Sequence, residues 1–146
     1  MKIISFDIND KSHADIAFAI RQKVFVEEQN VDREEEYDEY ETIAKHYLVF
    51  VDDQPAATSR WRHTDKGIKL ERFSVLPEFR NKGIGGALVK QVLSDVIPFE
   101  KLIYLHAQVA AMNVYARNGF EPVGDLFYEA NIPHYKMIYS LSKNED

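Results

Sequence analysis

Apolar and polar residues alternate over several short segments of the chain. Residues 2–8 follow this pattern, as a half-buried strand does, and three more alternating segments follow one another closely at 47–51, 56–63 and 68–75. Aspartate, proline and glycine stand between these three segments, which favours tight turns. The pattern predicts a strand near the N-terminus and an antiparallel meander in the middle of the chain.

Other segments repeat apolar residues every three or four positions, as the buried face of a helix does. A first helix is expected to begin with Ser12 as its cap and to run toward Glu27. A second helix covers 84–96, and a short third one covers 109–118 and ends at Gly119.

The remaining segments complete a mixed pattern. Residues 102–107 are expected to form a buried strand, and two last strands are expected around 121–124 and 135–141. The acidic stretch 29–43 has few apolar anchors and is expected to be a loop with a short helix. With 146 residues, of which 45% are apolar, the chain suits one domain that spans 1–146.

Composition narrows the classes of function. The chain has no cysteine, which excludes a disulfide framework and thiolate chemistry and fits a reducing cytoplasm. Its first residues lack the basic and apolar regions of a secretion signal, and no window approaches the roughly 18 apolar residues of a membrane helix. We therefore expect a cytoplasmic protein without a membrane partner.

Charge is distributed unevenly. The segment from Glu27 to Glu41 contains nine of the 24 acidic residues and one base, Arg33, so its own net charge is −8. The rest of the chain carries +2, which gives the total of −6. This distribution disfavours nucleic acid as a partner, because phosphates need a basic face. The segment suits either a cationic acceptor molecule or the role of a solvated acidic loop.

A glycine-rich turn, Arg80-Asn81-Lys82-Gly83-Ile84-Gly85-Gly86, lies between an expected strand and an expected helix. A helix N-terminus carries unpaired N–H groups and about half a positive charge, and glycine lets a diphosphate approach the backbone. The spacing matches neither a P-loop nor a dinucleotide fingerprint, which disfavours ATP, GTP and NAD. A tight turn without a ligand remains the alternative.

Two motifs together carry a family resemblance. The string Arg80-x-x-Gly83-x-Gly85, preceded by Val75-x-Pro77, resembles the coenzyme-A signature of the GNAT superfamily of N-acyltransferases. Downstream, Tyr115 stands four residues before Gly119-Phe120, which resembles the second signature of that superfamily.

Three further strings extend the resemblance over nearly the whole chain, to a bacterial subgroup called ElaA-like. They are Arg21-x-x-Val24-Phe25-Val26-x-Glu28-Gln29-x-Val31, His106-Ala107-Gln108 and Ile132-Pro133-His134-Tyr135-x-Met137. The resemblance implies an α/β (α+β) fold with a mixed, largely antiparallel sheet of about six to seven strands and about four helices. It also implies an N-acetyltransferase that moves an acetyl group from acetyl-CoA to a primary amine of a small molecule or peptide, by direct attack in a ternary complex.

The resemblance also implies a set of site residues. Tyr115 corresponds to the general acid near the sulfur, and the backbone of Phe73 and Val75 corresponds to the groups that pair with the pantetheine arm. Gln108 stands where many relatives have an asparagine, and Asn113 does not have the family's spacing. The expected coenzyme-A contacts are Phe73, Val75, Arg80, Asn81, Lys82, Gly83, Ile84, Gly85, Gly86, Gln108 and Tyr115.

Acetyl transfer to an amine also needs a proton acceptor, because an amine with a pKa of about 10.4 is mostly protonated at neutral pH. Glu71 is the first candidate base, since a half-buried carboxylate has a raised pKa; pairing with Arg60 for structure is the alternative. We expect the acceptor side to include Glu27, Glu28, His46 and His134. The five histidines have no metal-like spacing, so no metal site is expected.

Other functions remain open from the sequence. A non-catalytic acyl-CoA-binding or sensing module would need the same turn but would tolerate loss of Tyr115. An acyl-homoserine-lactone-type synthase is suggested by Val24-Phe25 before the acidic stretch, although the tryptophans of such enzymes are missing there. In a structural interaction domain the glycines would only turn the chain. The oligomeric state is also open, a homodimer included.

Overall fold

Seven strands form one sheet in this computed structural model, which describes residues 1–140. Their order is β1-β2-β3-β4-β5-β7-β6, and every neighbouring pair is antiparallel except β4 with β5. The strands are β1 (Lys2–Phe6), β2 (Lys45–Val51), β3 (Gln54–Thr64), β4 (Gly67–Val75), β5 (Ile103–Gln108), β6 (Phe120–Glu129) and β7 (Ile132–Tyr139). The predicted meander is β2-β3-β4, and the expectation of a mixed, largely antiparallel sheet is confirmed.

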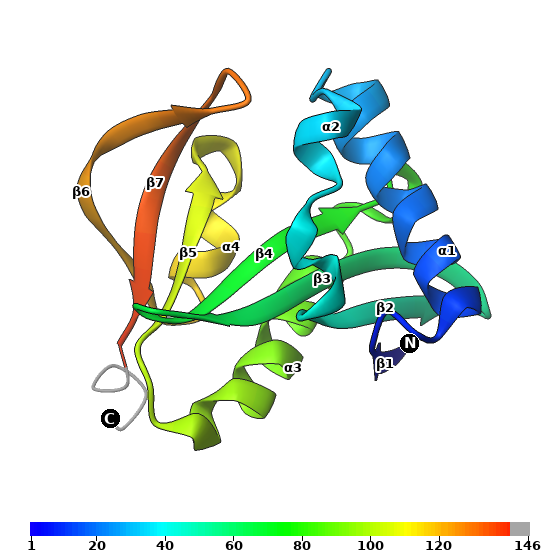
Figure 1. Ribbon diagram of the computed structural model, residues 1–146, viewed down its shortest axis with the longest axis horizontal. Helices are drawn as coiled ribbons and strands as arrows, with labels where there is room; N and C mark the ends of the chain where they lie inside the picture. The colour runs from blue at the N-terminus through cyan, green and yellow to red at the C-terminus, as the bar shows by residue number, and fades with distance from the viewer. Residues whose placement is uncertain (141–146) are drawn as a thin grey trace.

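Helices cover both faces of the sheet (Figure 1). The four α-helices of the described residues are α1 (Lys11–Arg21), α2 (Arg33–Glu36), α3 (Ile84–Val96) and α4 (Met112–Ala116). Shorter helical turns are η1 (Gln22–Glu28), η2 (Glu39–Thr42), η3 (Pro77–Phe79), η4 (Ile97–Phe99) and η5 (Val109–Ala111). In that part of the chain, none of the helices has the length and hydropathy that crossing a membrane requires.

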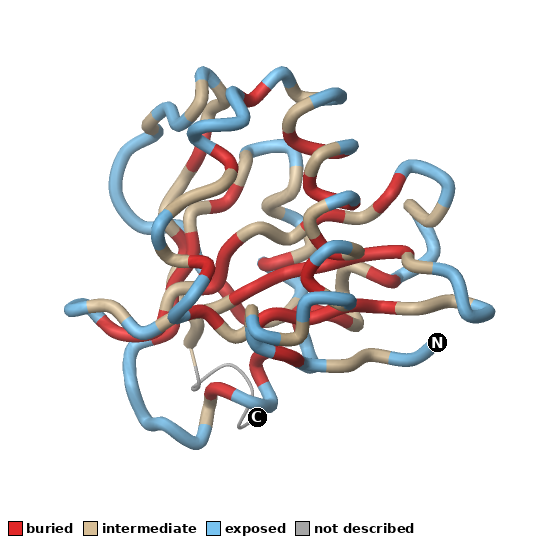
Figure 2. Tube along the Cα trace, turned by 45° about the vertical axis from the view of Figure 1, so that its right-hand side comes forward, coloured by how far each residue is buried: buried red, intermediate tan, exposed pale blue. Residues whose placement is uncertain are grey.

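The core lies on both sides of the central strands, which are the most buried part of the chain in Figure 2. Strand β2 shows why: Tyr47 and Val49 belong to the apolar cluster that includes α3, whereas Leu48 belongs to the cluster that includes α1. Successive residues of a strand point to opposite faces, so a strand between two helical layers is apolar throughout.

The first helix reaches Glu28, in agreement with the predicted run toward Glu27, but its cap and the form of its last turns differ from the prediction. Its cap is Asp10 rather than Ser12, because the Asp10 carboxylate accepts from the His13 backbone N–H at 3.4 Å. After Arg21 it continues as η1, a π-helix. π-helical turns are rare and are often found at functional sites.

The last hairpin is longer than predicted. Strands β6 and β7 meet at a two-residue turn, Ala130 and Asn131, with φ angles of 50° and 63°. Because β6 is an edge strand with mostly exposed residues, its sequence lacks a clear apolar alternation. Leu141, the last residue of the predicted strand 135–141, lies outside the described residues.

Candidate active site

The sheet opens between its two parallel strands. In these strands, residues Ile68–Leu70 of β4 pair with residues Ile103–Leu105 of β5, and beyond Leu70 and Leu105 the two strands separate (Figure 1). A cleft of about 1130 Å³ lies in this region, between η1, β4, the start of α3, β5, α4 and the β6-β7 hairpin. The edge of β4 beyond Leu70 is therefore available to an extended ligand.

A bulge shapes the free edge of β4. Thr58 of β3 lies opposite Ser74 of β4, and Arg60 lies opposite Glu71, so Ser59 has two residues of β4 opposite it. These are Arg72, which has a φ of 61°, and Phe73. Bulges bend a strand and are common beside active sites.

Beyond the bulge, the backbone of β4 points into the cleft. The Leu76 N–H donates to the Ala56 carbonyl at 2.9 Å, so these two residues form a hydrogen-bonded pair of the ladder. The polar backbone groups of a neighbouring residue then point to the opposite edge. Both Val75 and Phe73 have this orientation, which suits their predicted contact with the pantetheine arm.

The glycine-rich turn lies at one end of the cleft. Gly83 has a φ of 79° and occupies the N-cap position of α3, where no side chain caps the first N–H groups. A Cβ on Gly85 would meet only Val75 Cγ2, at 3.7 Å, and a Cβ on Gly86 only Asn118 Nδ2, at 4.0 Å. The N-terminal turn of α3 therefore faces open space, and an anion can approach its backbone.

Arg80 and Glu28 are joined to each other. The Arg80 guanidinium donates to both Glu28 carboxylate oxygens at 2.7 Å, and Arg80 Nε donates to the Val75 carbonyl at 2.9 Å. Hydrogen bonding to Arg80 lowers the pKa of Glu28. Sequence reasoning placed Arg80 on the coenzyme side and Glu28 on the acceptor side, and the pair links these two sides across the cleft.

Tyr115 lies in α4 with its ring packed between Phe73 and Phe120, at centroid distances of 5.8 and 6.2 Å. The residue lines the cleft, and within residues 1–140 its hydroxyl has no hydrogen-bond partner. Burial raises the pKa of the Tyr115 phenol, so the hydroxyl keeps its proton at neutral pH. A protonated hydroxyl beside the cleft can serve as a proton donor.

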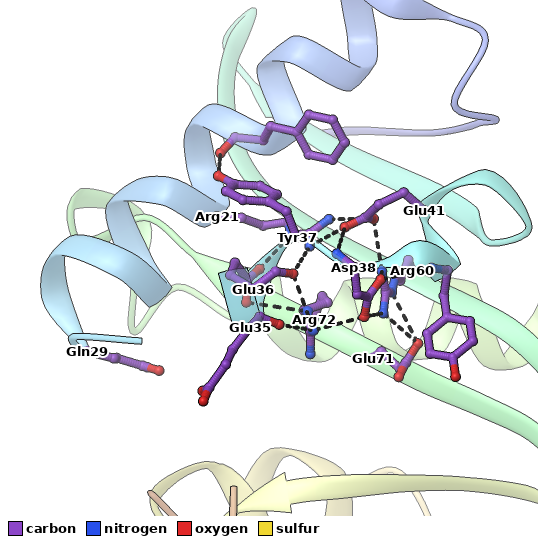
Figure 3. A network of polar contacts seen from close by, with 12 residues as sticks. Arg21, Gln29, Glu35, Glu36, Tyr37, Asp38, Glu41, Arg60, Glu71 and Arg72 are labelled. Carbon is purple, nitrogen blue, oxygen red and sulfur yellow. Dashed lines mark hydrogen bonds and ion pairs between the residues drawn. The ribbon is translucent and has the colours of Figure 1, made fainter. Parts of the chain in front are cut away.

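Ion pairs hold the acidic segment against the sheet (Figure 3). Arg21 donates to Glu36 at 2.6 Å and to Glu41 at 2.8 and 2.9 Å. Arg60 donates to both Asp38 oxygens at 2.8 Å, and its Nη1 also donates to Glu41 at 2.9 Å. These three acids are thus neutralised by arginines rather than presented to an acceptor.

Glu71 does not fit the predicted role of a base with a raised pKa. Arg62 Nε donates to its carboxylate at 2.9 Å, Arg60 Nε donates at 3.1 Å and Lys69 Nζ lies 3.3 Å away. Burial would raise the pKa of Glu71, but the charges of Arg60, Arg62 and Lys69 outweigh it and lower the pKa. The expected raised pKa is wrong, and the alternative of a structural pair with Arg60 describes the geometry.

Most of the other candidates line the cleft, but three do not. His46 is buried under α1, where it stacks on Phe6 at 5.6 Å and its Nε2 lies 2.9 Å from the Glu41 carbonyl. Lys82 lies over the Phe79 ring at 5.7 Å, and Glu27 is exposed outside the cleft. The candidates that do line it are Glu28, Glu71, Phe73, Val75, Arg80, Asn81, Gly83, Ile84, Gly85, Gly86, Gln108, Tyr115 and His134.

Two of these candidates have neighbours that the sequence did not suggest. Gln108 donates to Gln29 at 2.9 Å and connects β5 with the end of η1. His134 is buried, and its Nδ1 donates to the Ile132 carbonyl at 2.6 Å. No group of three or more potential metal ligands occurs among residues 1–140.

Sequence reasoning missed one pair in the cleft. His106 Nδ1 lies 2.6 Å from a carboxylate oxygen of Glu129, and both residues line the cleft. They are 23 residues apart and belong to strands that are not neighbours in the sheet. No local spacing could have predicted this contact, because it depends on the register of β7 between them.

Comparison with known proteins gives the family. The model of the acetyltransferase (GNAT) domain matches residues 9–141. The uncharacterized N-acetyltransferase YjcF of Bacillus subtilis is 37% identical over 124 residues, which cover 84% of this chain and 89% of YjcF.

Solved structures agree with this match. The crystal structure of Escherichia coli ElaA superposes with a TM-score of 0.86 at 25% identity, over 96% of this chain and 100% of ElaA. A GNAT family acetyltransferase from Elizabethkingia anophelis, solved with acetyl-CoA bound, has the same fold, with a TM-score of 0.63 at 18% identity over 94% of each chain. The match over residues 9–141, the geometry of the cleft and the likeness to YjcF and ElaA lead to one conclusion: the chain belongs to the GNAT acetyltransferase family.

Proposed function

We propose that this acyltransferase moves the acetyl group of acetyl-CoA to a primary amine of a small molecule or peptide, by direct attack in a ternary complex. The observation that carries the proposal is the cleft itself. It joins an uncapped helix N-terminus, an edge of β4 that pairs with no neighbouring strand and a protonated tyrosine hydroxyl in one space. The bound acetyl-CoA of the Elizabethkingia protein supports the choice of co-substrate.

The fit to coenzyme A rests on two parts of the cleft. The N–H groups at the start of α3 would bind the diphosphate, with Arg80 and Asn81 beside them. The backbone of Val75 and Phe73 would pair with the amides of the pantetheine arm, as an added strand pairs with a sheet edge. Gln108 would contact the arm from β5, on the opposite side of the cleft.

The chemistry needs three groups besides the coenzyme site. A proton acceptor must supply the amine in its neutral form. The Val75 N–H would stabilise the negative charge that develops on the thioester oxygen. Tyr115 would give its proton to the sulfur as the carbon–sulfur bond breaks.

Two measurements test the proposal together. Calorimetric titration with coenzyme A measures binding, and a thiol-release assay measures turnover of acetyl-CoA with a panel that contains a polyamine, an amino sugar and a lysine peptide. We expect both binding and turnover. Binding without turnover on any amine would favour a non-catalytic acyl-CoA-binding module, and no binding at millimolar coenzyme A would refute the assigned site.

A Gly85→Val variant tests the diphosphate site. We expect its Kd for coenzyme A to rise at least about tenfold, or about 1.4 kcal/mol, because the side chain fills the space in front of the helix N-terminus. The added Cβ meets only one atom of Val75 at 3.7 Å, so Tm should not fall. Gly85→Ala should show a smaller effect in the same titration. Equal Kd values for all three proteins would place the diphosphate elsewhere.

A Glu28→Gln variant tests the link between the two sides of the cleft. Glu28 is a negative charge paired with a predicted phosphate ligand, Arg80, at 2.7 Å. Removing this charge should lower the Kd for coenzyme A up to about fivefold at low salt, the range of an exposed ion pair, and less at high salt. Glu27→Gln makes the same charge change outside the cleft and should leave the Kd unchanged. Weaker binding in Glu28→Gln would instead show that Glu28 positions Arg80.

A further inference from the structure

His106 and Glu129 form a histidine–carboxylate pair on the wall of the cleft. The Nδ1–Oε1 distance is 2.6 Å, and the side chains are 27% and 45% exposed. The ring is held from its sides, by the Phe127 ring at 5.0 Å and the Tyr104 ring at 6.2 Å. The pair is therefore both oriented and accessible.

The position of His106 along β5 places it where the sheet begins to open. Leu70 and Leu105 are the last partners of β4 and β5, and Leu105 points into the core that includes α3. The next residues, Glu71 and His106, point to the opposite face because strand residues alternate. They flank the point where the two strands separate.

This point also suits the reacting end of the substrate. From the turn at Arg80, β4 leads back through Val75 and Phe73 toward Glu71, at about 3.3 Å per residue. A coenzyme with its diphosphate at the turn and its arm along β4 would extend its thioester toward the same region. Phe73 contacts Tyr115, so the proposed proton donor lies beside this path as well.

The hydrogen bond determines which nitrogen of His106 can accept a proton. The hydrogen bond to His106 lowers the pKa of Glu129, so the Glu129 carboxylate is ionised and can only accept a hydrogen bond. Nδ1 must then carry the hydrogen, which leaves the lone pair on Nε2. Within residues 1–140, Nε2 has no hydrogen-bond partner. Glu71 differs in this respect, because its carboxylate is already paired with three cations.

We propose that His106, oriented by Glu129, is the proton acceptor of the acetyl transfer, an inference that rests on the proposed function. His106 Nε2 takes one proton from the ammonium form of the acceptor. The nitrogen lone pair then forms the carbon–nitrogen bond as the carbon–sulfur bond breaks, and the sulfur keeps the bonding pair and takes the Tyr115 proton. A second proton from the nitrogen restores Tyr115, and His106 releases its proton to water, so that each turnover releases one proton.

Several charged or titratable groups face the His106 ring and will contribute to any pH profile. They are Glu129 from β6, His134 and Lys136 from β7, Lys69 and Glu71 from β4, and Tyr104 from its own strand. Two of these groups, Lys69 and Lys136, could also change the pH profile of kcat. A change in that profile is therefore interpreted only by comparison with variants of His106 and Glu129.

A His106→Gln variant provides the kinetic test. At saturating acetyl-CoA and with an amine that the wild type uses, kcat should fall about 100-fold, the lower end of what a positioned base contributes, and the acid limb of the kcat profile should be lost. Exogenous imidazole should restore part of the rate in His106→Ala. Glu129→Gln should also lower kcat and leave the Kd for coenzyme A unchanged, because the His106 ring loses the carboxylate that orients it.

The chain contains a matched control. His13 and Asp10 form the same kind of pair, with 2.6 Å between Nδ1 and Oδ2 and side chains 35% and 39% exposed, at the start of α1 and outside the cleft. His13→Gln should leave kcat and its pH profile unchanged. An equal kcat and acid limb in His106→Gln and the wild type would overturn the inference while leaving the proposed function intact.

A second readout does not depend on the acceptor. Nitrogen chemical shifts of the histidine rings report the tautomer, and we expect His106 to carry its hydrogen on Nδ1 at neutral pH. An Nε2–H tautomer would overturn the inference. Calorimetric titration of His106→Gln should give the wild-type Kd for coenzyme A. Loss of binding in the wild type would instead count against the proposed function.

Discussion

Tyr115→Phe is expected to lower kcat about 100-fold and to leave the KM for acetyl-CoA nearly unchanged, as loss of a proton donor in the transition state does. The phenylalanine ring keeps the contacts with Phe73 and Phe120, at 5.8 and 6.2 Å. Because the hydroxyl has no partner within residues 1–140, its loss leaves no unpaired group, and Tm should not fall. Steady-state thiol release and thermal unfolding measure the two quantities.

Tyr47→Phe is the opposite case and serves as the control. The Tyr47 hydroxyl donates to Asp95 at 2.7 Å and accepts from Trp61 at 3.0 Å, away from the cleft. Its loss should lower the free energy of unfolding by about 1–3 kcal/mol and leave kcat unchanged. A wild-type kcat in Tyr115→Phe would remove Tyr115 from the mechanism.

The parts of the site that sequence reasoning could predict depend on local chemistry. Glycine at position 83 is required by a positive φ of 79° at a helix N-terminus, and the strand before it and the helix after it have clear apolar patterns. The turn, its helix and its place in the chain therefore follow from neighbouring residues. Tyr115 followed from the resemblance, which depends on a short motif.

The parts that could not be predicted depend on contacts between distant segments. For Glu71 the sequence left two roles open, a base with a raised pKa and a partner of Arg60, and the contacts from Arg60 and Arg62 of β3 decide for the second. The acidic segment looked like a free negative surface, because its partner Arg21 lies 15 and 20 residues away. A pattern along one strand can suggest such a partner, but only the register of the neighbouring strand decides whether the contact forms.

The buried ion pairs also explain how a segment so rich in acids can be held in place. Arg60 is fully buried, at 0% exposure, and its guanidinium lies within 3.1 Å of carboxylate oxygens of Asp38, Glu41 and Glu71. Two of these acids belong to the segment and the third belongs to β4. Arg60 therefore ties the segment to β3 and β4 beside the cleft, in addition to the pairs that Arg21 forms from α1.

Arg60→Met should lower the free energy of unfolding by about 3–5 kcal/mol, because it leaves buried carboxylates without their counter-charge. Arg33→Met, on the exposed surface of the same segment, should change it by no more than about 0.5 kcal/mol. Denaturant unfolding with both variants measures the difference. A loss in Arg60→Met as small as that in Arg33→Met would mean that the pairs do not stabilise the fold.

Acid should reduce the difference between Arg60→Met and the wild type. Burial alone would raise the pKa of Asp38, Glu41 and Glu71. The neighbouring arginines outweigh burial and lower these pKa values below the ordinary values of 3.8, 4.5 and 4.5. A lowered pKa contributes stability above the unfolded value, and this contribution is lost as the pH falls through the folded value. The two proteins should therefore differ most at neutral pH and converge below about pH 4, because a protonated carboxyl group no longer needs the guanidinium. A difference that stays constant from pH 7 to pH 3 would point to lost packing of the arginine side chain instead of lost charge.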